Sequence, residues 1–249
     1  MKQLSVIILL LLILSCKGET ITYETVSFNA SDGLSITADL YMPHPEESPF
    51  IVLCHQAGWS RGEYLEIAPK LNALGYNCLA IDQRSGGEAN GITNETHKQA
   101  KTQKKGVSFL DAEVDINSAI DFVVNNYKMA NKVILWGSSY SSALAIKIGG
   151  ERNDIDGVLA FAPGEYFERF GKSGNYIETN AEQVKIPTFI TSAKSEKSNW
   201  WSIFKAIPVK SKSYFIPETK GQHGSRALWE KFPEHEAYWK AVKDFLKTI

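Results

Sequence analysis

Four serines stand within five positions in the stretch LWGSSYSS, residues 135–142. The stretch follows an apolar run typical of a buried strand and precedes residues with helical periodicity. A sharp turn from a strand into a helix exposes the residue at its apex, and it requires small residues two positions before and after the apex. Ser139 meets this requirement with Gly137 and Ser141, whereas the preceding serine would place a tryptophan in the crowded position. The spacing therefore predicts that Ser139 is a nucleophile and that the other serines serve packing.

A serine hydroxyl needs partners before it can attack a carbonyl carbon. It is a weak nucleophile at neutral pH, so a histidine must lie within hydrogen-bond reach and a carboxylate must orient that histidine. Of the five histidines, only His223 lies in a loop between the last predicted strand and the C-terminal helical segment. Two glutamates, Glu196 and Glu165, each follow a predicted strand closely. Either could supply the carboxylate.

The elements that must position these residues alternate between strand-like and helix-like segments. The ranges 21–28 and 35–43 alternate apolar and polar residues around a Ser-Asp-Gly turn, which predicts an antiparallel hairpin. Helix-period segments separate further runs that are almost continuously apolar, as strands buried on both faces are. These runs are 50–55, 77–82, 132–137, 155–162, 187–193 and 212–217. We therefore predict an α/β fold: a mostly parallel eight-stranded sheet with an N-terminal antiparallel hairpin and helices on both faces.

Composition narrows the classes of partner. The chain has 249 residues, 43% of them hydrophobic and 22% charged, with a net charge of −1, so a nucleic acid is not an expected partner. We expect neither a metal nor a cofactor, because no His, Cys or Asp cluster has ligand spacing and no glycine-rich phosphate loop opens a helix. Cys54 and Cys78 fall at opposite ends of neighbouring predicted strands, so we expect both thiols to be buried and unpaired.

The N-terminus has the layout of a secretory signal peptide. One lysine precedes a short apolar stretch, which ends in ILSC at Cys16. This ending resembles the lipobox of bacterial lipoproteins, in which the cysteine is acylated; the alternative is an ordinary signal with an incidental cysteine. The expected organisation is a signal peptide over 1–15, a lipid-anchored tether over 16–20 and one domain over 21–249. The expected location is the cell envelope, facing the periplasm or the exterior, with membrane contact only through the lipid.

The order and spacing of the elements from about Tyr23 onward, together with GSSYS, resemble the α/β-hydrolase family, whose nucleophile elbow is Gly-x-Ser-x-Gly. Ser141 stands where the second glycine is usual. GQHGS around His223 resembles the His-Gly loop of the family. IPTFITSAKSE resembles the segment that carries the acid, which favours Glu196, although some members carry their acid at the position of Glu165.

The resemblance also implies an oxyanion hole, in which backbone N–H groups stabilise the negative oxygen of the transition state. Tyr140, directly after the nucleophile, supplies one donor. HQAG at 55–58 resembles the His-Gly-x-x stretch of the family, which implies Ala57 as the other donor and Gln56 as the second choice. His55 is expected to brace this loop.

These residues predict a serine hydrolase that cleaves a small carboxylic ester through an acyl-enzyme intermediate. The loop HQAGWSRGEY and the single-domain size resemble the dienelactone-hydrolase-like branch, which typically carries a cysteine nucleophile, so the serine shifts the expectation toward a general esterase. Two alternatives stay open: a peptidase or amidase of the same fold, and a catalytically silent carbohydrate- or lipid-binding protein. Residues 163–186 are too few for a lid domain. The expected substrate pocket contains the aromatic residues Trp59, Tyr166, Phe167 and Trp200. Trp200 also has the spacing of a helix residue that faces the core.

Overall fold

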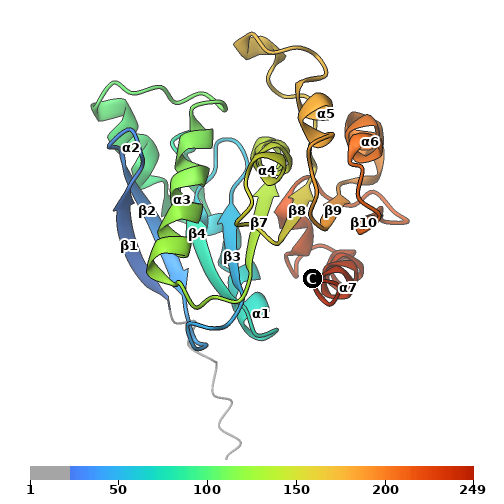
Figure 1. The fold of residues 1–249 in the computed structure, drawn as a ribbon, viewed down its shortest axis with the longest axis horizontal. Coiled ribbons are helices and arrows are strands. Elements are labelled where there is room, and N and C mark those ends of the chain that lie inside the picture. Colours follow the sequence, from blue (N-terminus) through green and yellow to red (C-terminus); the bar gives the residue numbers. More distant parts are fainter. Residues whose placement is uncertain (1–22) are drawn as a thin grey trace, which may run out of the picture.

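The computed structural model describes residues 23–249, and its centre is the predicted eight-stranded sheet (Figure 1). β1 pairs antiparallel with β2 and β2 antiparallel with β4, whereas the other neighbouring pairs are parallel. The predicted hairpin and all eight predicted strands are confirmed. The predicted signal peptide, Cys16 and the tether lie outside the described residues. In sheet order the strands are β1 (Glu24–Asn29), β2 (Ser35–Tyr41), β4 (Asn77–Ile81), β3 (Phe50–Cys54), β7 (Val133–Ser138), β8 (Gly157–Phe161), β9 (Thr188–Thr191) and β10 (Lys212–Phe215).

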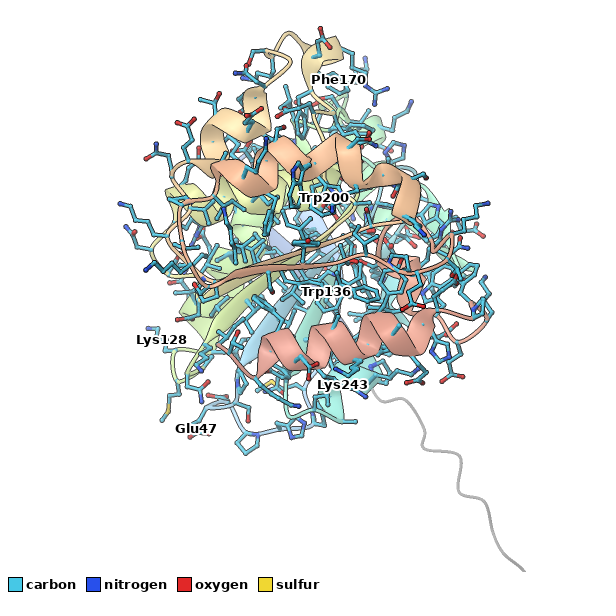
Figure 2. The ribbon with its side chains drawn as sticks, turned by 90° about the vertical axis from the view of Figure 1, so that its right-hand side faces the viewer. Glu47, Lys128, Trp136, Phe170, Trp200 and Lys243 are labelled. Carbon is cyan, nitrogen blue, oxygen red and sulfur yellow. The ribbon has the colours of Figure 1, made fainter. Side chains whose placement is uncertain are left out.

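Helices cover both faces of the sheet, as predicted (Figure 1). Successive side chains of a strand point to opposite faces, so β3 contributes Val52 to one hydrophobic core and Leu53 to the other. Figure 2 shows α6 and α7 on opposite sides of β10. The first core lies beneath α3 (Ala112–Asn126), α4 (Tyr140–Glu151), α5 (Tyr176–Ala181) and α6 (Lys197–Ala206), and the second beneath α1 (Ile67–Asn72) and α7 (His235–Leu246).

Two regions differ from the sequence prediction. The segment after β4 forms a small two-stranded sheet, β5 (Glu88–Ala89) with β6 (Ile92–Thr93), and then α2 (Glu95–Thr102), none of which was predicted. The C-terminal helical segment is shorter than predicted, because α7 begins only after Pro233, which cannot continue a helix that precedes it.

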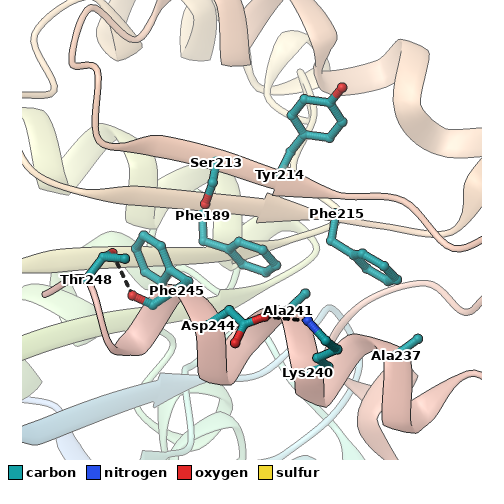
Figure 3. Close-up of a pocket in the computed structure, with 10 residues that line it drawn as sticks. All are labelled: Phe189, Ser213, Tyr214, Phe215, Ala237, Lys240, Ala241, Asp244, Phe245 and Thr248. Atoms are coloured by element: carbon teal, nitrogen blue, oxygen red, sulfur yellow. Dashed lines mark hydrogen bonds and ion pairs between the residues drawn. The ribbon is translucent and has the colours of Figure 1, made fainter.

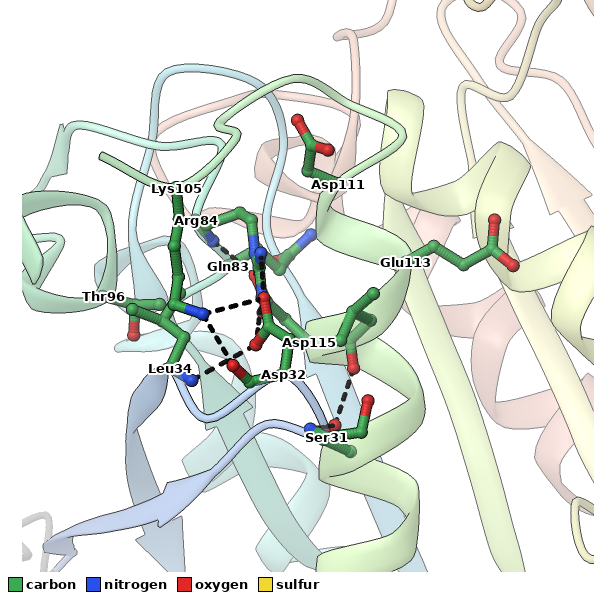
Figure 4. A network of polar contacts seen from close by, with 12 residues as sticks. Ser31, Asp32, Leu34, Gln83, Arg84, Thr96, Lys105, Asp111, Glu113 and Asp115 are labelled. Atoms are coloured by element: carbon green, nitrogen blue, oxygen red, sulfur yellow. Dashed lines mark hydrogen bonds and ion pairs between the residues drawn. The ribbon is translucent and has the colours of Figure 1, made fainter. Parts of the chain in front are cut away.

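A buried arginine fixes the loop that follows β4 (Figure 4). Arg84 is 3% exposed, and its guanidinium contacts Asp115 on α3 at 2.7 Å and Asp32 in the β1–β2 turn at 2.8 Å. The Arg84 backbone N–H also donates to Asp115 at 2.7 Å. Hairpin, loop and helix are therefore joined by charge-assisted hydrogen bonds, which are stronger than neutral ones.

The chain leaves β3 toward β4 on one side of the sheet and returns to β7 on the other side. Such a switch point opens a crevice at the carboxyl ends of the two strands, where α/β proteins place their sites. Cys54, the last residue of β3, is in register with Gly137 of β7. The loop after β3 and the turn after β7 consequently start side by side. Cys54 and Cys78 are buried and free, as predicted.

Candidate active site

The predicted sharp turn is present at Ser139. This residue joins β7 directly to α4 with φ 58° and ψ −123°, a backbone conformation that strains a residue with a side chain. A Cβ atom at Gly137 would lie 2.4 Å from the Ser141 carbonyl oxygen and 2.4 Å from the Ser142 Cα. Only glycine fits there, which is the physical reason for a small residue two positions before the apex.

Ser141, which replaces the usual second glycine, fastens the turn. Its hydroxyl accepts the Ser138 N–H at 3.0 Å and lies 2.8 Å from the Cys54 carbonyl oxygen and 2.9 Å from that of His55. A glycine would leave these groups without this partner. The hydroxyl therefore joins the nucleophile turn to the end of β3, beyond the packing role predicted from the sequence.

The loop that carries His223 is held against the same turn. The Ser225 N–H donates to the Ser138 hydroxyl at 2.9 Å, and the Trp136 indole N–H donates to the Ser225 hydroxyl at 2.9 Å. Gly224 has φ 71°, and a Cβ atom there would lie 2.6 Å from Ser138 Oγ. The glycine of the His-Gly pair is thus required by the close approach of loop and turn.

His223 contacts Glu196, one of the two predicted candidates for the acid. The Nδ1–Oε1 distance is 2.6 Å, and the side chains are 28% and 23% exposed. A carboxylate only accepts hydrogen bonds, so Nδ1 carries the proton and Nε2 is left as a proton acceptor. Glu196 Oε2 accepts the Ala193 N–H at 3.2 Å, which fixes the carboxylate.

Glu165 has a different task. Its two carboxylate oxygens accept the N–H groups of Ile177 and Glu178, both at 2.8 Å, at the start of α5. Helix N-termini leave such groups without intrahelical acceptors, and a carboxylate there also suits the helix dipole. The alternative acid is therefore committed to α5, and the carboxylate that meets His223 is that of Glu196.

The loop after β3 is a tight turn, in which the Trp59 N–H donates to the Gln56 carbonyl oxygen at 3.3 Å and Gly58 has φ 75°. The Gln56 N–H donates to Glu63 Oε2 at 2.8 Å. Gln56 is therefore wrong as the second-choice oxyanion donor, because its N–H is already directed away to a carboxylate. Ala57, the next residue of the turn, stays the predicted donor from this loop.

Tyr140 is the first residue of α4, where an N–H has no intrahelical acceptor. This position suits the predicted oxyanion donor. His55 braces the neighbouring loop, as predicted: Nδ1 lies 2.7 Å from the Gln56 carbonyl oxygen, and Nε2 accepts the Gln83 N–H at 3.0 Å. Complete burial lowers the pKa of His55 to about 4, so the ring is neutral at physiological pH.

Two of the four predicted pocket residues lie beside the site. The Tyr166 hydroxyl donates to the Ala162 carbonyl oxygen at 2.7 Å, and the preceding carbonyl, that of Phe161, accepts the Ser139 N–H at 2.7 Å. Burial raises the pKa of this phenol to about 12. Trp59 is half-buried and stacks on Trp229, with ring centroids 5.3 Å apart.

The other two predicted pocket residues belong to the core. Phe167 is completely buried and packs edge-on against Tyr176. Trp200, in α6 (Figure 2), is also completely buried, and its indole N–H donates to the Ser192 hydroxyl at 2.8 Å. Both pocket predictions are wrong for one reason. Apolar contacts of the surrounding helices enclose these rings on the first core face.

Sequence reasoning missed two residues of the site. Glu63 is completely buried in a 3₁₀ turn, Arg61–Tyr64, and Arg226 donates through Nε to the His223 carbonyl oxygen at 3.2 Å. Glu63 stands four residues before the apolar Ile67 and so shares its face in a helical reading, which predicts burial of Glu63 but none of its contacts. Nothing in the sequence distinguishes Arg226 from other loop arginines.

One hollow on the surface lies away from this site. It has a volume of about 400 Å³ and lies between β9, β10 and α7 (Figure 3), and none of its lining residues is a predicted site residue. Within residues 23–249, no group of three His, Cys, Asp or Glu side chains is arranged to hold a metal ion. In the same range no helix is both long and apolar enough to cross a membrane.

Fold and site together define a hydrolase of the α/β type. Residues 45–170, about half of the chain, match the family model described as Serine aminopeptidase, S33 (Hydrolase_4), and the chain belongs to this family. The matched part includes Ser139 and the loop after β3 but ends before Glu196 and His223.

Two curated relatives share 28% identity with the chain. One is the quorum-quenching protein AidA of Acinetobacter baumannii, matched over 141 residues, which is 55% of this chain and 43% of AidA. The other is the thiohydrolase apmlB of Arthrinium phaeospermum, matched over 160 residues, which is 62% of this chain and 48% of apmlB. The match spans about half the length of these relatives.

Solved structures resemble nearly the whole chain. An esterase of Pyrococcus furiosus superposes with a TM-score of 0.71 at 17% identity, covering 92% of this chain and 93% of the esterase. A dienelactone hydrolase of Anabaena variabilis superposes with a TM-score of 0.70 at 16% identity, covering 91% of this chain and 97% of that hydrolase. An acylaminoacyl peptidase of Pyrococcus horikoshii superposes with a TM-score of 0.65 at 17% identity, covering 91% of this chain and 41% of the peptidase. At these identities the likeness shows the fold, and it confirms the predicted α/β-hydrolase architecture.

Proposed function

We propose that this protein is a serine hydrolase that cleaves small carboxylic esters, with Ser139 as nucleophile, His223 as base and Glu196 as the acid that orients it. The observation that carries the proposal is the 2.6 Å contact between His223 and Glu196 in a loop tied to the Ser139 turn. A protein that only binds a ligand has no use for a strained serine and an oriented histidine at the same edge of the sheet.

The reaction follows from the roles of these groups. Ser139 Oγ attacks the ester carbonyl carbon while His223 Nε2 takes its proton, and Glu196 stabilises the imidazolium. The Tyr140 and Ala57 N–H groups receive the oxyanion of the tetrahedral intermediate. His223 then protonates the leaving alcohol, which leaves an acyl group on Ser139. A water molecule, deprotonated by His223, attacks this acyl-enzyme and releases the carboxylic acid and the free serine.

A peptidase or amidase is the second candidate, because the family description names an aminopeptidase and one similar structure is an acylaminoacyl peptidase. The same groups serve both reactions. Comparing kcat/KM for p-nitrophenyl acetate with that for alanine p-nitroanilide separates them. Faster cleavage of the anilide, after correction for its lower intrinsic reactivity, would favour the peptidase.

The proposal is tested by labelling with a fluorophosphonate probe and by hydrolysis of p-nitrophenyl acetate. We expect the probe to add its mass at Ser139, and Ser139→Ala to lose labelling and at least about 10⁴-fold of kcat/KM. Ser138→Ala keeps the nucleophile and should still be labelled. A probe adduct on another serine, or an active S139A, would overturn the assignment.

The identity of the acid has a matched pair of variants. Glu196→Gln should lower kcat by about 10³- to 10⁴-fold, because an amide in place of the carboxylate no longer fixes the productive imidazole tautomer. Glu165→Gln, at the start of α5, should keep a turnover close to that of the unmodified protein. The reverse result would transfer the role to Glu165.

We further propose that the mature protein is held at the cell envelope by a lipid on Cys16. The support is the ILSC ending of a signal-type segment. A single α/β domain then acts on small esters at the membrane surface, where the lipid holds it.

A further inference from the structure

A carboxylate that the proposed mechanism does not use lies directly behind the site. Glu63 belongs to the 3₁₀ turn that follows the Gln56–Trp59 loop, and it is completely buried. Buried carboxylates are costly unless hydrogen-bonded. Both oxygens of this carboxylate must therefore accept hydrogen bonds within the protein.

The carboxylate joins three segments that carry site residues. Oε2 accepts the Gln56 N–H at 2.8 Å, and Oε1 accepts the Ser138 hydroxyl at 2.7 Å. The Ser138 oxygen in turn accepts the Ser225 N–H at 2.9 Å. One side chain thus connects the loop of the oxyanion donor, the strand end before the nucleophile and the loop of the histidine.

The contact at Gln56 also fixes the direction of the Ala57 N–H. The Gln56 N–H is held by Glu63, and the Gln56 carbonyl oxygen lies 2.7 Å from His55 Nδ1 and accepts the Trp59 N–H at 3.3 Å. The peptide that follows Gln56 is trans and planar, so its N–H, which belongs to Ala57, points opposite to that carbonyl. Both ends of Gln56 are pinned, and the Ala57 donor is aimed by them.

Above its pKa, which burial raises to about 7, Glu63 is ionised, and a carboxylate then suits the groups around it. The groups that face its oxygens are all donors: the Gln56 N–H, the Gln56 side-chain amide at 3.3 Å and the Ser138 hydroxyl. An ionised carboxylate only accepts, whereas a glutamine would turn an NH₂ group toward other donors. A positive charge on His223, as the proposed mechanism forms it, opposes the rise that burial causes in the pKa of Glu63.

We propose that Glu63 is a positioning residue of this hydrolase: its carboxylate aims the Ala57 N–H at the oxyanion and holds the three site segments together. The inference rests on the proposed ester hydrolysis by Ser139. It adds a residue that acts through Gln56 and Ser138 and does not touch the substrate.

The test compares Glu63→Gln with the unmodified protein, per active site titrated with the fluorophosphonate probe. We expect kcat/KM for p-nitrophenyl acetate to fall roughly 10- to 100-fold with little change in KM, because a misaimed oxyanion donor weakens the transition state and spares substrate binding. The inhibition constant of a trifluoromethyl ketone, whose serine adduct carries an oxyanion, should rise by the same factor.

Glu165→Gln is the matched control, since Glu165 also accepts two N–H groups but at the start of α5. It should leave both quantities unchanged. Ser138→Ala removes one hydroxyl of the network and should cause smaller losses that do not add to those of E63Q. If E63Q does not fold, S138A carries the same comparison.

The outcomes are distinct. An E63Q protein with unchanged kcat/KM per active site, or with reduced kcat/KM but an unchanged ketone inhibition constant, would overturn the role of Glu63. An unmodified protein that neither reacts with the probe nor cleaves any ester would instead overturn the proposed function.

Discussion

The four serines of residues 138–142 have separate tasks that their shared side-chain chemistry conceals. Ser139 stands at the strained apex, Ser138 relays between Glu63 and the histidine loop, and Ser141 fastens the turn to β3. The Ser142 hydroxyl donates to the Ser139 carbonyl oxygen at 2.6 Å, within the first turn of α4. Backbone position, which decides what each hydroxyl meets, determines the role.

The buried Glu63 makes stability depend on pH. Burial raises its pKa from 4.5 to about 7. Between these values the folded protein binds a proton that the unfolded chain has released, so the free energy of unfolding falls as the pH rises through this window. The full effect is on the order of 3 kcal/mol. Glu63→Gln lacks it.

We therefore expect the urea midpoint of the unmodified protein to fall relative to that of E63Q as the pH is raised from about 5 to about 8. The measurement is urea unfolding of both proteins at several pH values. A difference in midpoint that is the same at every pH would show that Glu63 does not change its protonation on folding in this range.

At the scale of elements, the connection between β8 and β9 decides how open the site is. It contains only a three-residue 3₁₀ turn, Glu168–Phe170, and the six residues of α5, so the prediction of no lid domain is confirmed. The Arg169 guanidinium lies 4.3 Å from the centre of the Phe109 ring, which stacks on Tyr140. The connection is thus fastened beside the nucleophile turn.

From this connection we expect kcat/KM for p-nitrophenyl esters to peak between acetyl and butyryl. Each acyl methylene buried against the aromatic wall contributes at most about 0.8 kcal/mol, and the wall is short because Phe167 and Trp200 belong to the core. No rate increase is expected at a lipid interface. A steady rise through long chains, or a jump when the substrate forms micelles, would reveal an acyl tunnel.

At the scale of the whole molecule, the proposed anchor places the domain at a membrane. We expect Cys16→Ser to abolish incorporation of labelled palmitate and to shift the protein from the membrane fraction to the soluble fraction. Cys54→Ser and Cys78→Ser are the matched controls, since both thiols are buried in strands and neither should change labelling. Equal incorporation in C16S and in the unmodified protein would exclude the anchor.

The sequence predicted the sheet well because buried parallel strands leave an apolar signature. It also predicted Ser139, His223 and Glu196 as site residues, because each follows a strand whose carboxyl end meets the crevice, and the structure brings Glu196 into contact with His223. The sequence could not distinguish aromatic residues that line the substrate pocket from those that belong to the hydrophobic core. Phe167 and Trp200 are as apolar as Trp59, and only tertiary packing decides which ring is covered.

The missed residues have another cause. Arg226 contacts the His223 carbonyl three positions before it, and Glu63 contacts the Gln56 N–H seven positions before it and the Ser138 hydroxyl on β7. These contacts depend on how the loops fold, which the residue types alone do not specify. The exclusion of Gln56 as a donor depended on the same information, because its N–H is occupied by a residue seven positions away. The helix α2 was missed because its residues are mostly polar, and it packs on the core by Ala100.

The two buried thiols, Cys54 and Cys78, can be used to measure how often the protein opens locally. Burial raises the pKa of Cys54 and of Cys78 well above that of a free thiol, and alkylating reagents attack the thiolate. The Cys54 side chain lies in the first core and that of Cys78 in the second, so a reagent reaches each thiol only when the helices that cover that face of the sheet move away. The rates at which iodoacetamide labels Cys54 and Cys78 under native conditions therefore report, separately, how often each face of the sheet opens.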